Sequence, residues 1–125
     1  MDLSEKIVVS VLTSWLEEHS DPEESLYAFA YDITIRNHSD QPVKLISRHW
    51  YITDGESEVE EVKGPGVLGK QPLIQPGEKY YYSSGVALPT PVGSMRGYYV
   101  MQAEDSTLFH ANIPIFTLAA GHHLN

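Results

Sequence analysis

Large apolar residues recur at every second position over most of this chain, which is the spacing of side chains along a β-strand. The clearest segment runs from Tyr27 to Arg36, where one parity holds only large apolar residues: Tyr27, Phe29, Tyr31, Ile33 and Ile35. The residues between them are small or polar, so one face is predicted to meet a core and the other to face solvent or a neighbouring layer. Similar alternation over residues 7–16 and 79–88 predicts two more strands.

No stretch of helical length keeps an apolar period of 3.6 residues, so the chain is predicted to be all-β. Further strands are expected over residues 43–54, 59–62, 95–103 and 108–118. Residues 95–103 are apolar on both parities, which predicts a central strand covered on both sides. About seven strands with frequent turn signals indicate an antiparallel sandwich or barrel.

The segment from Val43 to Asp54 changes phase. Val43 and Leu45 are odd-numbered, whereas Ile46, Trp50 and Ile52 are even-numbered. A regular strand cannot bury both sets on one face, so we expect a β-bulge near residues 45–47 and a core position for Trp50.

Arg48 and His49 lie directly after this phase change. Arg48 shares the parity of Trp50, so an inward guanidinium must find acceptors or reach the sheet edge, whereas a bulge would instead let Arg48 turn out beside the following loop. His49 has the opposite parity and is expected to be exposed if Trp50 lies in the core.

Turn and edge signals separate the strands. Asp54-Gly55 predicts a hairpin, and the acidic segment from Val59 to Val62 predicts a charged edge strand. Pro114 interrupts the last strand and marks an edge or a bulge, because proline cannot donate to the ladder.

The segment from Lys63 to Lys79 is rich in glycine and proline and is predicted to form one long loop, with Leu73-Ile74 turned inward. Pro76-Gly77 fits the two central positions of a type II turn. Ala119 to Asn125 reads as a tail.

Length and composition predict one domain over residues 1–125, large enough to need no disulfide or metal staple. The chain has no cysteine, no apolar run of membrane-spanning length and no signal-peptide pattern at its start, so we expect a cytoplasmic protein without membrane insertion. Eight basic residues stand against 17 acidic ones, a net charge of −9. Such a surface repels phosphate backbones, so nucleic acid is excluded as a direct ligand, and the charge is expected mainly to aid solubility.

The spacing Gly64-x-Gly66-x-x-Gly69 matches a dinucleotide-binding motif as text. That motif needs a helix opening at its third glycine to hold the pyrophosphate, and here Lys70-Gln71-Pro72 follows without any helical pattern. Two interpretations stay open: the loop amides form a nest for an anion with Lys63, Lys70 and Arg48 nearby, or the glycines only permit a tight loop.

Histidines and hydroxyl residues are the side chains of this sequence that could serve as metal ligands and nucleophiles. The six histidines, His19, His38, His49, His110, His122 and His123, show no ligand spacing on a helix or strand, so no metal or cofactor is predicted. No motif assembles a catalytic group from the residues with suitable chemistry, Ser83, Ser84, His49, His110 and Asp54. No catalytic residues are therefore predicted.

A set of short motifs in one order resembles the ApaG family over nearly the whole chain. They are Phe29-Ala30-Tyr31, Ile33-Thr34-Ile35, Ser47-Arg48-His49-Trp50, Ile52-Thr53-Asp54, Gly64-x-Gly66-Val67-x-Gly69-x-Gln71-Pro72, Ile74-x-Pro76-Gly77-Glu78, Tyr82-x-Ser84-Gly85, Leu88-x-Thr90-Pro91-x-Gly93-x-Met95-x-Gly97 and Ile113-Pro114-x-Phe116. The resemblance implies an antiparallel β-sandwich of the immunoglobulin-like, fibronectin type III-like kind, with about seven or eight strands. It also implies a link to cobalt resistance and magnesium efflux, and to adaptor domains of larger eukaryotic proteins.

The first functional hypothesis is a non-enzymatic binding or adaptor module that holds an unknown partner protein or an anionic group. Its candidate site residues are Arg48, His49, Gly64, Gly66, Gly69, Lys70 and Gln71. The alternatives are a regulator that binds Co²⁺ or Mg²⁺ directly and a protein that binds or processes phosphates or nucleotides. Edge strands also allow a homodimer.

Overall fold

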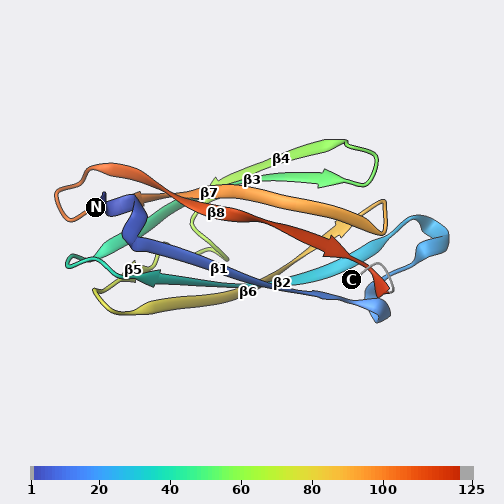
Figure 1. The fold of residues 1–125 in the computed structure, drawn as a ribbon, viewed down its shortest axis with the longest axis horizontal. Coiled ribbons are helices and arrows are strands. Elements are labelled where there is room, and N and C mark those ends of the chain that lie inside the picture. Colours follow the sequence, from blue (N-terminus) through green and yellow to red (C-terminus); the bar gives the residue numbers. More distant parts are fainter. Residues whose placement is uncertain (1, 122–125) are drawn as a thin grey trace.

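The computed structural model describes residues 2–121 and confirms an all-β sandwich of two antiparallel sheets (Figure 1). The first sheet has the order β1-β2-β6 and the second the order β4-β3-β7-β8, with the two-residue strand β5 paired to β3. The strands are β1 (Ile7–Trp15), β2 (Tyr27–Asn37), β3 (Val43–Asp54), β4 (Val59–Pro65), β5 (Leu73–Ile74), β6 (Lys79–Leu88), β7 (Val92–Gln102) and β8 (Leu108–Ala119). The short 3-10 helices are η1 (Leu3–Lys6), η2 (Glu17–His19) and η3 (Pro22–Glu24). Among residues 2–121, no helix is long and apolar enough to cross a membrane.

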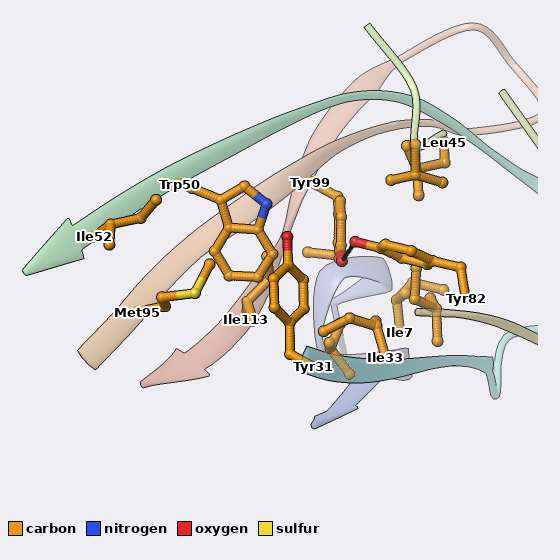
Figure 2. Close-up of a cluster of buried hydrophobic side chains, with 14 of the residues drawn as sticks. Ile7, Tyr31, Ile33, Leu45, Trp50, Ile52, Tyr82, Met95, Tyr99 and Ile113 are labelled. Atoms are coloured by element: carbon orange, nitrogen blue, oxygen red, sulfur yellow. Dashed lines mark hydrogen bonds between the residues drawn. The ribbon is translucent and has the colours of Figure 1, made fainter. Parts of the chain in front are cut away.

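The core lies between the two sheets and takes the residues that the alternation predicts. On β2, Phe29, Ile33 and Ile35 are at most 1 % exposed. Trp50 on β3 is 2 % exposed and makes an edge contact with the Tyr31 ring at a centroid distance of 5.5 Å (Figure 2). It makes a second edge contact with the Phe116 ring at 5.9 Å. The core position of Trp50 is confirmed.

The phase change in β3 is a β-bulge, as predicted. Leu45 pairs with Met101 and Ser47 pairs with Val100, so Ile46 is the extra residue between two consecutive partners on β7. The bulge places Leu45 and Trp50 on the same inner face although their numbers differ in parity.

Several turn and edge predictions are confirmed. The acidic strand β4 lies at a sheet edge, and β8, which contains Pro114, is both an edge strand and irregular in register opposite Met95–Gly97. The Glu78 amide donates to the Gln75 carbonyl at 3.0 Å across Pro76-Gly77, and Gly77 has φ of +80°, which is a type II turn.

Three expectations are wrong in part. The segment Lys63–Lys79 is not one loop, because β4 continues through Gly64 to Pro65 and β5 pairs with Val43 and Lys44. Strand β7 is central, but its outer face is not covered, since Tyr98 and Val100 are only half-buried and Arg96 is exposed. Ala119 and Ala120 are buried rather than part of a tail, and residues 122–125, with His122 and His123, lie outside the described residues.

Candidate functional site

Arg48 meets the segment from Gly64 to Pro72, which we call the glycine segment, where β3 pairs with β4. The register places Arg48 opposite Gly64 and His49 opposite Lys63. The Arg48 guanidinium donates through Nη1 to the carbonyls of Pro65, at 3.1 Å, and Gly66, at 3.0 Å. Of the two outcomes expected for this inward arginine, the structure realises the one in which it finds acceptors at the sheet edge.

Ile46, the bulged residue, anchors the other side of the segment. Its carbonyl accepts the Gly66 amide at 2.8 Å and the Gln71 Nε2 group at 2.9 Å. The Leu45 amide, one residue earlier, donates to the Pro72 carbonyl at 2.9 Å. The bulge therefore fixes the glycine segment at both of its ends.

Each of the three glycines of the motif is favoured at its position by a different feature of the structure. A Cβ at Gly64 would lie 2.9 Å from Nη2 of Arg48, and one at Gly66 would lie 2.1 Å from the Lys70 carbonyl oxygen. Gly69 has φ of +76° and follows Leu68 with φ of +49°, in a tight turn closed by reciprocal hydrogen bonds between Val67 and Lys70. Positive φ at both central residues is the geometry of a type I′ turn.

This geometry favours the conformational interpretation of the motif over an anion nest. The amides of Gly66, Val67 and Lys70 already donate to carbonyls of the bulge and the turn. A dinucleotide site would need a helix that begins at Gly69. Within residues 2–121, the next element after Gly69 is strand β5 instead.

A surface pocket of about 390 Å³ joins part of the predicted site. Of the seven candidate residues it is lined by Arg48, His49, Gly64 and Gln71, together with Lys63. Its remaining walls come from Ile46, Ser47, Pro65, Tyr98 and Val100. Gly66, Gly69 and Lys70 do not line it, and Gly69 lines a separate hollow of about 150 Å³ with Arg48 and Tyr82.

Beside this pocket, the outer face of the five-stranded sheet carries a row of stacked rings from three strands, which we call the outer stack: His110, Tyr98, His49 and Tyr51. The ring centroids of His110 and Tyr98 lie 4.1 Å apart, those of Tyr98 and His49 4.9 Å, and those of His49 and Tyr51 4.7 Å. The Arg96 guanidinium covers the Tyr51 ring at 4.4 Å from its centroid. The pattern of the sequence does not predict this row.

Hydrogen bonds fix the imidazole at the centre of the outer stack. The Tyr98 hydroxyl lies 3.0 Å from Nδ1 of His49, and the Glu61 carboxylate lies 2.5 Å from Nε2. Because a carboxylate only accepts, Nε2 donates to Glu61. The expectation of an exposed His49 is wrong, since its side chain is 12 % exposed between Tyr98 and Tyr51.

Two of the residues with chemistry suited to catalysis, Ser83 and Asp54, have other partners. Ser83 donates to the Asp32 carboxylate at 2.6 Å, and Asp54 accepts the amides of Glu56 and Glu58 in the β3–β4 turn. Within residues 2–121, no group of three or more histidine, aspartate or glutamate side chains could hold a metal ion.

A second polar contact lies inside the sandwich, on the other side of β3 and β7 from the outer stack. The hydroxyls of Tyr82 and Tyr99 lie 2.5 Å apart between the sheets (Figure 2). Burial raises the pKa of both phenols above the ordinary value of 10.0. Both groups are neutral at physiological pH, and this pair belongs to the core rather than to a surface site.

The sequence and the fold both match known proteins. The family model described as the ApaG domain matches residues 17–103. This chain belongs to the ApaG family. The ApaG protein of Dechloromonas aromatica is 54 % identical over 115 residues, which cover 92 % of this chain and 91 % of that protein. The ApaG protein of Thiobacillus denitrificans is 57 % identical over 114 residues, 91 % of this chain and 90 % of that protein.

A solved structure supports the same assignment. The crystal structure of the putative ApaA protein from Bordetella pertussis superimposes on this ApaG chain with a TM-score of 0.90 at 47 % identity, covering 93 % of this chain and 94 % of that one. The resemblance seen in the sequence motifs, and the sandwich that it implies, are therefore confirmed.

Proposed function

We propose that this ApaG protein is a non-enzymatic binding module that holds a partner protein at the pocket between Arg48 and Val100. The observation that carries the proposal is the combination of a pocket of about 390 Å³ with the outer stack, the row of rings that borders it. Aromatic side chains and arginine are enriched in protein interfaces, because they supply large contact areas at low cost in conformational entropy.

The lining of the pocket sets the chemistry of the partner. Its apolar walls come from Ile46, Pro65 and Val100, and its cationic rim from Arg48 and Lys63. A partner segment with an apolar side chain beside a carboxylate would match both. Lys63 also lies 3.9 Å from the Glu61 carboxylate, so the two cations leave the rim with a net positive charge, which favours one orientation of an acidic segment.

Support for a binding role rather than catalysis comes from the surroundings of His49. Its two ring nitrogens contact the Tyr98 hydroxyl and the Glu61 carboxylate, an arrangement that orients an imidazole between two partners. Covalent catalysis through such a chain would also need donors placed to stabilise a developing oxyanion. The nearby amides of Gly66 and Val67 instead donate to carbonyls of the chain itself.

The test of this site compares three variants as immobilised baits. Val100→Asp places a charge on the pocket wall and Lys63→Glu reverses the rim, while Val8→Asp makes the same change as the first on the exposed outer face of the other sheet. We expect one partner to be held by wild type and Val8→Asp and lost from the two pocket variants. Calorimetry with that purified partner should show Kd raised about tenfold or more by Val100→Asp. Equal retention by all variants would overturn the site.

The link to cobalt and magnesium is proposed to run through this partner, in the cytoplasm, rather than through a metal site of the chain. Calorimetry with millimolar CoCl2 and MgCl2 tests this. We expect no saturable heat from a variant with His122→Ala and His123→Ala, which removes the adjacent histidines outside the described residues. Saturable one-to-one binding by that variant would replace the proposal with direct cation binding.

A further inference from the structure

Arg36 and Lys79 are directly opposite one another in the register of β2 and β6. Paired residues of antiparallel strands point to the same face with Cβ atoms about 5 Å apart, and like charges in that position destabilise a sheet. In residues 2–121, neither side chain has a carboxylate within salt-bridge distance. This holds although acidic residues outnumber basic ones by 17 to 8.

The same two residues line the cavity at the end of the sandwich where β2 ends and β6 begins, beside β5 (Figure 1). This cavity has a volume of about 440 Å³ and is also lined by His38, Leu73 and Tyr80. Its volume lies in the range that holds small organic ligands.

Besides Arg36 and Lys79, the end of η1 and one carboxylate border the cavity. The His38 amide donates to the Lys6 carbonyl at 2.8 Å, which brings the end of η1 to the same place. Glu78 is the one carboxylate among the lining residues, and its Oε1 atom accepts the Gln75 amide within the turn. On β1, the residue paired with Arg36 is Val8, which offers no counter-charge.

We propose that this cavity binds the phosphate group of a small phosphate monoester. A guanidinium recognises phosphate oxygens in bidentate fashion and an ammonium adds a point charge, so one dianion would relieve the repulsion between Arg36 and Lys79. Leu73 is 56 % exposed on the adjacent wall and gives the apolar body of the ester a surface. The site is separate from the pocket at Arg48 and does not depend on the function proposed for it.

Phenyl phosphate and inorganic phosphate serve as probes, titrated into the whole protein at constant ionic strength and followed by calorimetry and amide NMR shifts. We expect saturable one-to-one binding, tighter for phenyl phosphate, with shifts centred on β5 and the Pro76-Gly77 turn. Arg36→Gln and Lys79→Gln should each weaken binding roughly tenfold or more. Lys70→Gln, which removes the same charge from the exposed glycine turn, should leave it unchanged.

A melting experiment checks that the variants fold and adds a second readout. Without probe, Arg36→Gln and Lys79→Gln should melt no lower than wild type, because each removes a like-charge contact. Phenyl phosphate should raise Tm of wild type and not of the two variants. The proposal is overturned if neither probe binds at millimolar concentration, or if Lys70→Gln weakens binding as much as Arg36→Gln.

Discussion

The guanidinium of Arg48 lies against the Cα atom of Gly64, its direct partner on the neighbouring strand. An added Cβ would lie 2.9 Å from Nη2 and 3.0 Å from Cζ of Arg48. The contact lets an inward-facing arginine reach the carbonyls of Pro65 and Gly66 at the sheet edge. The first glycine of the motif thus serves the arginine rather than a ligand.

Gly64→Ala is expected to lower the free energy of unfolding by about 1–2 kcal/mol, because the new methyl group displaces the guanidinium from its acceptors. In the Arg48→Ala background the same change should be neutral or stabilising by up to about 1 kcal/mol, since glycine is otherwise unfavourable inside a strand. Urea unfolding of the four proteins of this double-mutant cycle measures the coupling. A cost that is the same in both backgrounds would show that the contact has no energetic role.

Gly66 and Gly69 are expected to respond differently to alanine although both have positive φ. At Gly69 nothing lies within 4 Å of an added Cβ, so Gly69→Ala should cost only the backbone strain, about 1–2 kcal/mol. At Gly66 the added atom would also lie 2.1 Å from the Lys70 carbonyl oxygen, which is backbone and cannot rotate away. Gly66→Ala should therefore cost clearly more in urea unfolding, and equal costs would contradict the collision.

The sandwich could be predicted from the sequence because a strand buried on one face has apolar residues at every second position. Phe29, Ile33 and Ile35 follow this alternation and are all buried. The change of parity between Leu45 and Trp50 located the bulge to within a residue. Strand β5 was missed because two residues, Leu73 and Ile74, are too few to show a period.

The outer stack could not be predicted, because alternation tells which face a residue takes but not which residue stands beside it. His49 and Tyr98 are 49 positions apart, and only the register of β3 and β7 brings them together. A useful signal was present, since aromatic residues and histidine at predicted outward positions of several strands are unusual for a solvated face. The glycine motif misled in the opposite way, because its text matches a ligand site while its geometry serves a turn.

Stability should fall steeply above pH 10, because of Tyr82 and Tyr99. Burial raises the pKa of both phenols above the 10.0 of an unfolded chain. Below pH 10 the folded and the unfolded state both keep the two phenol protons, so these groups do not make the free energy of unfolding depend on pH. Above pH 10 only the unfolded state releases them, so the free energy of unfolding should drop by up to about 2.7 kcal/mol per pH unit.

Urea unfolding between pH 9 and pH 11 measures that slope. Tyr82→Phe should about halve it, and should also cost about 1–3 kcal/mol at neutral pH because the Tyr99 hydroxyl loses its partner. The double change Tyr82→Phe with Tyr99→Phe should remove most of the slope. If the slope of this double variant equals that of wild type, other groups cause the alkaline loss.

Asn37 is the polar residue on which the end of β2 depends, and Asn37→Asp is expected to be strongly destabilising at neutral pH. The side chain is 1 % exposed, and its Nδ2 group donates to the carbonyls of Gln41, at 2.8 Å, and Ile74, at 2.9 Å. A carboxylate would turn both contacts into repulsion between acceptors in a buried place. We expect a loss of about 3 kcal/mol or more at pH 7.

At pH 5 the cost of Asn37→Asp should be smaller, because burial raises the pKa of an aspartate and protonation restores one donor. Asn112→Asp on the exposed face of β8 is the matched control and should change stability by less than about 0.5 kcal/mol at either pH. Urea unfolding of both variants at pH 5 and pH 7 separates the cost of the lost hydrogen bonds from the cost of the buried charge. A cost that does not depend on pH would mean that the loss comes from the missing hydrogen bonds alone, whereas the predicted pH dependence would show that the buried charge dominates.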